Sequence, residues 1–76
     1  MILYDKSIET KIVPATDTKG QRVAWAINGG WSYSGYDYAL NREENQRVVA
    51  EGEAQKIGYA VVCGVPFANG IVWAID

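Results

Sequence analysis

The sequence contains no histidine and only one cysteine, Cys63. A structural zinc site takes four ligands that are mostly Cys or His, and a disulfide within the chain needs two cysteines. We therefore expect no metal, no cofactor and no internal disulfide. A cysteine nucleophile also needs a base to activate it, which is commonly histidine. We interpret Cys63 as a buried structural thiol.

Long apolar runs and basic clusters are missing as well. Apolar stretches such as residues 59–63 are far shorter than the roughly 20 residues that cross a bilayer. No basic segment followed by an apolar run stands at the start, so we expect no signal peptide. The net charge is −2, whereas proteins that coat nucleic acid usually carry a basic stripe. These absences predict a cytoplasmic protein without a membrane partner, and they argue against a nucleic-acid partner.

What the sequence does have is a high apolar content in a short chain. Of its 76 residues, 49% are hydrophobic, and these include three tryptophans and five tyrosines. A chain of this length predicts a single domain over residues 1–76. Because so small a domain buries a modest share of its surface, the large aromatic side chains are expected to contribute to the core.

Apolar and polar residues alternate in several short segments, which is typical of β-strands with one covered face. In the first of these segments, Ile8, Thr10 and Ile12 share one face. Pro14 ends that strand, and the pair Asn28-Gly29 favours a tight hairpin turn. The predicted strands are residues 8–13, 21–27, 31–36, 60–63 and 71–75, and the predicted connections include residues 14–20 and 64–70. The pattern predicts an α+β fold: an antiparallel sheet of about five short strands with one helix packed on one face.

The one predicted helix spans residues 42–57. Asn41 has the character of an N-cap, and Glu44 completes the spacing of a capping box. Gly58 suits the left-handed residue that follows a helix. The stripe expected to face the sheet consists of Val49, Ala50, Ala54 and Ile57. Glu53 falls inside this stripe, so it either reaches water at the stripe's edge or marks a face left free for a partner.

The most unusual segment, residues 31–38, interleaves aromatic residues with Ser and Gly. Such surfaces bind proteins well, because rigid aromatic side chains supply contact area at a low cost in entropy. We predict a protein-binding surface formed by Trp31, Tyr33, Tyr36, Asp37 and Tyr38. One alternative is that the strand aromatics are partly core residues, and another is that the same surface closes a homodimer.

Two further groups of residues have side chains suited to binding or catalysis. Lys11, Lys19, Arg22 and Trp25 would form a small stacking platform for single-stranded nucleic acid if the fold brought them together. The carboxylates of Asp37, Glu43 and Glu44 cluster near the predicted helix start, where the helix dipole favours acidic residues without any catalytic role. The glycines form no dinucleotide-binding or phosphate-binding pattern. We therefore do not expect an enzyme.

A resemblance to a known group of proteins rests on four motifs, TKIVPAT at residues 10–16, TKGQRV at 18–23, YDYALN at 36–41 and GIVW at 70–73. With these motifs the chain resembles a family of short proteins of bacterial phages, plasmids and integrated mobile elements that has no assigned activity. In that family an apolar residue is expected at the position of Glu53, and a more polar hairpin at the positions of Trp25, Trp31 and Tyr33.

The resemblance implies an accessory protein of a phage or mobile element that works in the cytoplasm of a bacterial host. Small acidic proteins of that setting often bind a host or defence protein, as anti-CRISPR inhibitors do, so the function is inferred by analogy. The leading hypothesis is a non-enzymatic module that binds such a protein through its aromatic hairpin surface. The alternative is a weak single-stranded nucleic-acid-binding module.

Overall fold

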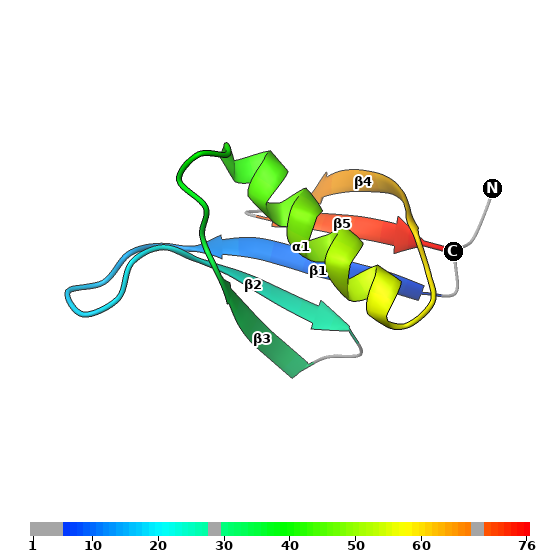
Figure 1. The fold of residues 1–76 in the computed structure, drawn as a ribbon, viewed down its shortest axis with the longest axis horizontal. Coiled ribbons are helices and arrows are strands. Elements are labelled where there is room, and N and C mark those ends of the chain that lie inside the picture. Colours follow the sequence, from blue (N-terminus) through cyan, green and yellow to red (C-terminus); the bar gives the residue numbers. More distant parts are fainter. Residues whose placement is uncertain (1–5, 28–29, 68–69) are drawn as a thin grey trace.

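The computed structural model describes residues 6–27, 30–67 and 70–76, which form five strands and one helix (Figure 1). In chain order these are β1 (Lys6–Val13), β2 (Arg22–Ile27), β3 (Gly30–Gly35), α1 (Arg42–Lys56), β4 (Val61–Phe67) and β5 (Gly70–Ile75). The strands form one antiparallel sheet in the order β3-β2-β1-β5-β4. The predicted α+β class is confirmed. The turn expected at Asn28-Gly29 lies outside the described residues.

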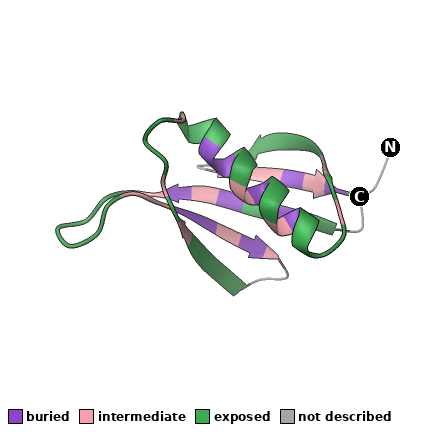
Figure 2. Cartoon of the chain, in the orientation of Figure 1, coloured by how far each residue is buried: buried purple, intermediate pink, exposed green. Residues whose placement is uncertain are grey.

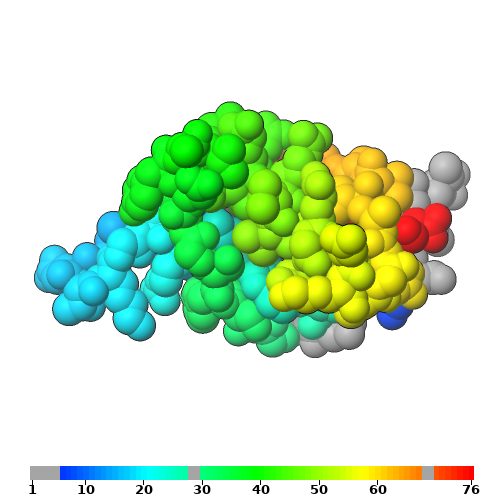
Figure 3. Space-filling view, viewed as in Figure 1, coloured from blue at the N-terminus to red at the C-terminus, as the bar shows by residue number. Residues whose placement is uncertain are grey.

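The core lies between α1 and one face of the sheet, because strand residues of one parity point toward the helix. In β1, Ile8, Thr10 and Ile12 are buried as the alternation predicts. The buried cluster beneath α1 also contains Trp73 and Ile75 of β5. Figure 2 shows these buried positions as bands on the central strands and on α1, while β3 and β4 at the margins of the sheet are largely exposed. The loop of residues 14–21 projects from this body (Figure 3).

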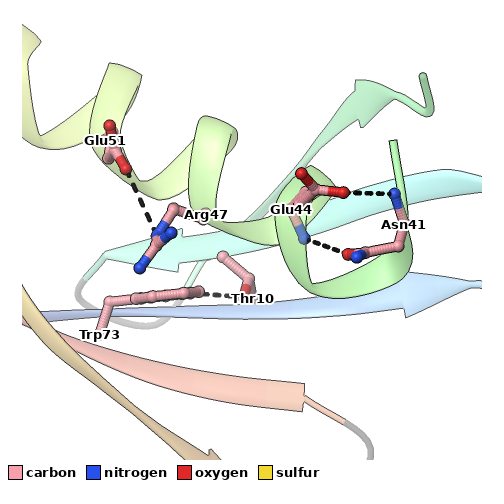
Figure 4. Close-up of polar contacts among 6 residues, drawn as sticks. All are labelled: Thr10, Asn41, Glu44, Arg47, Glu51 and Trp73. Carbon is pink, nitrogen blue, oxygen red and sulfur yellow. Dashed lines mark hydrogen bonds and ion pairs between the residues drawn. The ribbon is translucent and has the colours of Figure 1, made fainter. Parts of the chain in front are cut away.

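Helix α1 begins as the sequence predicts. The Asn41 side chain accepts a hydrogen bond of 2.8 Å from the Glu44 backbone N–H, and the Glu44 carboxylate accepts one of 3.1 Å from the Asn41 backbone N–H (Figure 4). These reciprocal bonds form the capping box and satisfy two of the donors that a helix start leaves free. After the helix, Gly58 has a φ of 83°, in the left-handed region that glycine adopts without strain.

The buried face of α1 differs from the predicted stripe. Ala50 and Ala54 are fully buried, but Val49 is half-buried and Ile57 is 45% exposed. The buried face continues instead toward the helix start, through Asn45 and Gln46. These polar residues can be buried because each has hydrogen-bond partners within the fold.

Gln46 joins α1 to β1, and through Thr10 to β5, by hydrogen bonds between buried side chains. The Thr10 hydroxyl donates a hydrogen bond of 2.9 Å to Gln46 Oε1 and accepts one of 2.9 Å from Trp73 Nε1. Asn45 bonds to the connection that precedes the helix. Its Oδ1 accepts a hydrogen bond of 2.7 Å from the Asp37 backbone N–H, and its Nδ2 donates one of 2.9 Å to the Asp37 carbonyl. Side-chain hydrogen bonds therefore fix both the position of α1 on the sheet and the conformation of the connection that leads into it.

The prediction for the chain after the helix was wrong in two respects. The segment expected as a connection, residues 64–70, mostly continues the strand pairing of β4 and β5. Pro66 is tolerated there because β4 is an edge strand, where a missing N–H need not break a ladder. Cys63, expected to be buried, is exposed on this edge strand.

Candidate functional site

Strand alternation sends one set of side chains to the sheet face opposite α1, which we call the open face. The strand registers place on it Glu9, Lys11, Arg22, Ala24, Ala26, Trp31, Tyr33, Cys63, Val65, Phe67, Val72 and Ala74. Because α1 packs on the other face, no helix in the described part of the chain covers these side chains (Figure 1).

Among the residues that the structure describes, four large apolar side chains of the open face are exposed, and all four belong to the two edge strands. Trp31 and Tyr33 of β3 are 40% and 57% exposed, and Val65 and Phe67 of β4 are 59% and 68% exposed. Large exposed apolar side chains that share one face commonly mark a contact site. The predicted binding residues Trp31 and Tyr33 thus lie at the surface.

Between the two edge strands the open face is hollowed. A depression of about 140 Å³ is bounded by Trp31 on one side and Phe67 on the other, with Val72 and Gly70 between them. Its lining also includes Glu9 and Lys11. A hollow of this kind accepts one or two apolar side chains of a partner, whereas a small-molecule site usually has several times this volume.

Two cations lie on the aromatic rings of β3. Lys11 Nζ is 4.3 Å from the Trp31 ring centroid, and Arg22 Cζ is 4.8 Å from the Tyr33 ring centroid. Such contacts stabilise both the ring and the cation. They place two positive charges beside the exposed aromatics, and the buried Nε of Arg22 has no hydrogen-bond partner among the described residues.

The other predicted binding residues lie in the connection between β3 and α1. The rings of Tyr36 and Tyr38 are 5.0 Å apart, and Tyr38, 72% exposed, accepts a hydrogen bond of 3.3 Å from the Gln21 backbone N–H. The Asp37 carboxylate accepts a hydrogen bond of 2.9 Å from the Ala39 backbone N–H. Tyr36, Asp37 and Tyr38 therefore order this connection and the end of the β1–β2 loop, apart from the rings of β3.

The residues of the nucleic-acid alternative do not form one platform. Lys11 and Arg22 lie on the open face, but Trp25 points to the opposite face and packs against the core cluster. Lys19 lies in the exposed loop of residues 14–21, where its backbone N–H donates to the Thr16 hydroxyl at 3.1 Å. Of the three cations in that alternative, Lys11 and Arg22 lie beside Trp31 and Tyr33 instead.

The sequence does not identify Val65 and Phe67 as surface residues of a strand, because Gly64 and Pro66 are typical of a connection. The alternation of Cys63, Val65 and Phe67 was the available signal, since an edge strand tolerates proline at positions whose N–H makes no hydrogen bond in the sheet.

The acidic residues near the helix start have structural roles. The Glu44 carboxylate completes the capping box, and the Asp37 carboxylate stabilises a turn. Within the described residues, no group of three metal-binding side chains comes together. No helix among those residues has the length and apolar character to span a bilayer.

Comparisons with protein-family models, with curated proteins and with solved structures find no match to this chain. The resemblance to proteins of phages and mobile elements therefore stays a prediction.

Proposed function

We propose that this chain is a non-enzymatic protein-binding module whose contact surface is the open face. The observation that carries the proposal is the exposure of Trp31, Tyr33, Val65 and Phe67 on one sheet face, on either side of a hollow. Aromatic side chains at the centre of a contact supply most of the binding energy in typical interfaces. Such a module acts by occupying a surface of its partner.

The sequence resemblance supplies the setting of the proposal. An accessory protein of a phage or mobile element would meet its partner in the bacterial cytoplasm, and that partner would be a host or defence protein. Inhibition by steric contact, which we propose by analogy with anti-CRISPR proteins, needs no catalytic group in the inhibitor. The resemblance contributes only this setting, whereas the contact surface is argued from the open face.

A second candidate function is supported by one observation. The exposed rings of Trp31 and Tyr33 lie beside Lys11 and Arg22, and single-stranded nucleic acid binds to surfaces that combine stacking rings with cations. The net charge of −2 works against this alternative. Salt separates the two, because nucleic-acid binding weakens steeply as salt rises, whereas a contact made mainly of apolar side chains does not.

The test is capture of a partner from bacterial lysate by the immobilised chain, with a variant of the open face beside a matched control. Trp31→Ser/Phe67→Ser removes a ring from each side of the hollow, and capture should fall by at least about tenfold. Val48→Ser/Ile57→Ser removes two apolar side chains that are exposed on α1 and just after it, so capture should persist. Tyr36→Ala/Tyr38→Ala measures the contribution of the second aromatic group.

The proposal is wrong if the open-face variant captures the same proteins as the wild type at the same level. Capture that disappears after nuclease treatment would favour the nucleic-acid alternative. Circular dichroism of each variant checks that its fold is retained.

A further inference from the structure

The two edges of the sheet differ in how they are protected against strand pairing. Edge strand β4 contains Pro66, and its pairing with β5 is irregular between Val61 and Cys63. Both features are devices that natural proteins use to keep an edge from pairing with another chain. Edge strand β3 has neither: its sequence is GWSYSG, without proline or charge, and it pairs with β2 in unbroken register from Gly30 to Gly35.

The unprotected edge of β3 is also accessible. Five of its six residues are exposed, and Ser34 is half-buried. An edge strand carries a row of backbone N–H and C=O groups that can pair with an added strand about 4.8 Å away. A partner segment in extended conformation could extend the sheet at this edge, as in the recognised mode of strand addition.

The charges beside β3 decide which segment fits. An added strand would place alternate side chains on the open face, next to Trp31 and Tyr33, where Lys11 and Arg22 lie on the rings. In residues 6–27, 30–67 and 70–76, the ion pairs join Arg47 to Glu51 and Lys56 to Glu53, so neither of these two cations is paired there.

We propose that β3 binds an extended acidic segment of the partner protein by strand addition, with carboxylates at alternate positions reaching Lys11 and Arg22. The spacing follows from β3, because Trp31 and Tyr33 are two residues apart and share a face. The carboxylates form charge-assisted hydrogen bonds with the Lys11 ammonium and the Arg22 guanidinium. A second copy of β3 is a poorer occupant, because its sequence brings no acid and its own cations would approach Lys11 and Arg22. This inference rests on the proposed function, since it names the segment that the open face recognises.

The experiment uses a blocked synthetic peptide in which glutamate alternates with valine, added to isotope-labelled full-length chain at about millimolar concentration, where weak binding is measurable. Amide chemical shifts and hydrogen exchange should change along β3, with little change along β4. The same peptide with glutamine in place of glutamate should bind at least about fivefold more weakly, because it lacks the charge-assisted bonds. Two further peptides carry N-methyl groups on alternate amides, in one or the other of the two possible registers. The peptide whose methylated amides face β3 should bind more weakly than the other, because those amides can no longer donate hydrogen bonds to the edge strand.

Variants of the chain test the charges and the edge separately. Arg22→Gln and Lys11→Gln should reduce the preference for glutamate over glutamine. Ser32→Lys places a charge on the edge strand and should weaken binding of the glutamine peptide, which has no carboxylate to attract the new lysine. Val62→Lys on the opposite edge strand should leave binding of that peptide unchanged. Circular dichroism and the amide spectrum confirm that each variant keeps the fold.

The preference for an acidic segment is overturned by equal binding of the glutamate and glutamine peptides. Strand addition at β3 is overturned by shifts centred on β4 or α1, or by no shift at all. It is also overturned if oligothymidylate binds the open face more tightly than the acidic peptide, or if light scattering shows a dimer that Ser32→Lys dissociates. The proposed function can survive these results: if lysate capture still depends on Trp31 and Phe67, the open face binds a protein by another mode.

Discussion

The indole Nε1 of Trp73 donates a hydrogen bond of 2.9 Å to the hydroxyl oxygen of Thr10, and both residues are buried (Figure 4). The same hydroxyl donates to Gln46 Oε1 at 2.9 Å, so Thr10 acts as both acceptor and donor between β5 and α1. Along the chain, Trp73 is 63 residues from Thr10 and Gln46 is 36 residues from it, so both contacts join distant elements. A buried polar group stabilises a fold when its bonds are made, and removing one member leaves the others unsatisfied.

Thr10→Val should therefore destabilise the domain although valine nearly matches threonine in shape. The Trp73 N–H and the Gln46 carbonyl oxygen would both lose a partner in a buried site, at a cost of about 2 kcal/mol in the free energy of unfolding. Urea unfolding followed by circular dichroism measures the change. Thr18→Val, in the exposed loop, is the control and should stay near the wild type. Equal midpoints for the two variants would contradict the role of the network.

Asn41→Ala should lower the free energy of unfolding by about 1 kcal/mol, because it removes the acceptor of the Glu44 N–H at the start of α1. Asn41→Asp keeps an oxygen at the same position and should remain close to the wild type. Thermal unfolding of the three proteins provides the comparison. A wild-type midpoint for the alanine variant would mean that the helix start does not depend on this cap.

The parts of the fold that local sequence determines were predictable. Alternation within 8–13 and 21–27 located β1 and β2, and the spacing of Asn41 and Glu44 located the start of α1. The burial of Gln46 could not be predicted, because it depends on the Thr10 hydroxyl, which comes from a distant strand. From the helix sequence alone, a glutamine among charged residues is expected to be exposed to solvent.

The candidate site was predictable only in part, because it too depends on contacts between distant strands. The segment that contains Trp31 and Tyr33 was recognisable from composition, but their exposure depends on β3 being an edge strand, which is a property of the sheet order. Phe67 lies on the same face only because β4 continues past Gly64, and β4 can do so because the glycine leaves room for Trp73. Long-range packing thus decides which local patterns meet on one surface.

Glu53→Leu should stabilise the domain. The Glu53 side chain is only 18% exposed and pairs with Lys56 Nζ at 2.9 Å, while the Lys56 side chain is 72% exposed. A helical ion pair of this kind contributes about 0.5 kcal/mol or less, whereas burying most of a leucine contributes about 1–2 kcal/mol. Glu51→Leu is the matched control, because the Glu51 side chain is 57% exposed and the new leucine would stay in water. A lower melting temperature for Glu53→Leu would show that the ion pair outweighs the added burial.

Alanine substitutions at two glycines should change stability in opposite directions. A Cβ at Gly64 would lie 2.6 Å from Cε3 and Cζ3 of the Trp73 ring and 3.1 Å from the Ile71 Cγ2. The ring cannot move away freely, because its Nε1 is bonded to Thr10 beneath α1. Overpacking of this kind commonly costs about 1–3 kcal/mol, so Gly64→Ala should lower the free energy of unfolding.

Gly52→Ala is the counterpart on α1. Apart from its chain neighbours and the backbone of its own helix, a Cβ at Gly52 would meet no atom within 4 Å. Replacing a glycine inside a helix by alanine contributes about 1 kcal/mol through helix propensity. Both variants add one methyl group. A difference in the sign of the change in unfolding free energy therefore reports the effect of the surroundings of each glycine. Urea unfolding of both should show a lower midpoint for Gly64→Ala and a higher one for Gly52→Ala. A Gly64→Ala protein as stable as the wild type would mean that β4 shifts to admit the methyl group, and that the Trp73 ring does not require glycine beneath it.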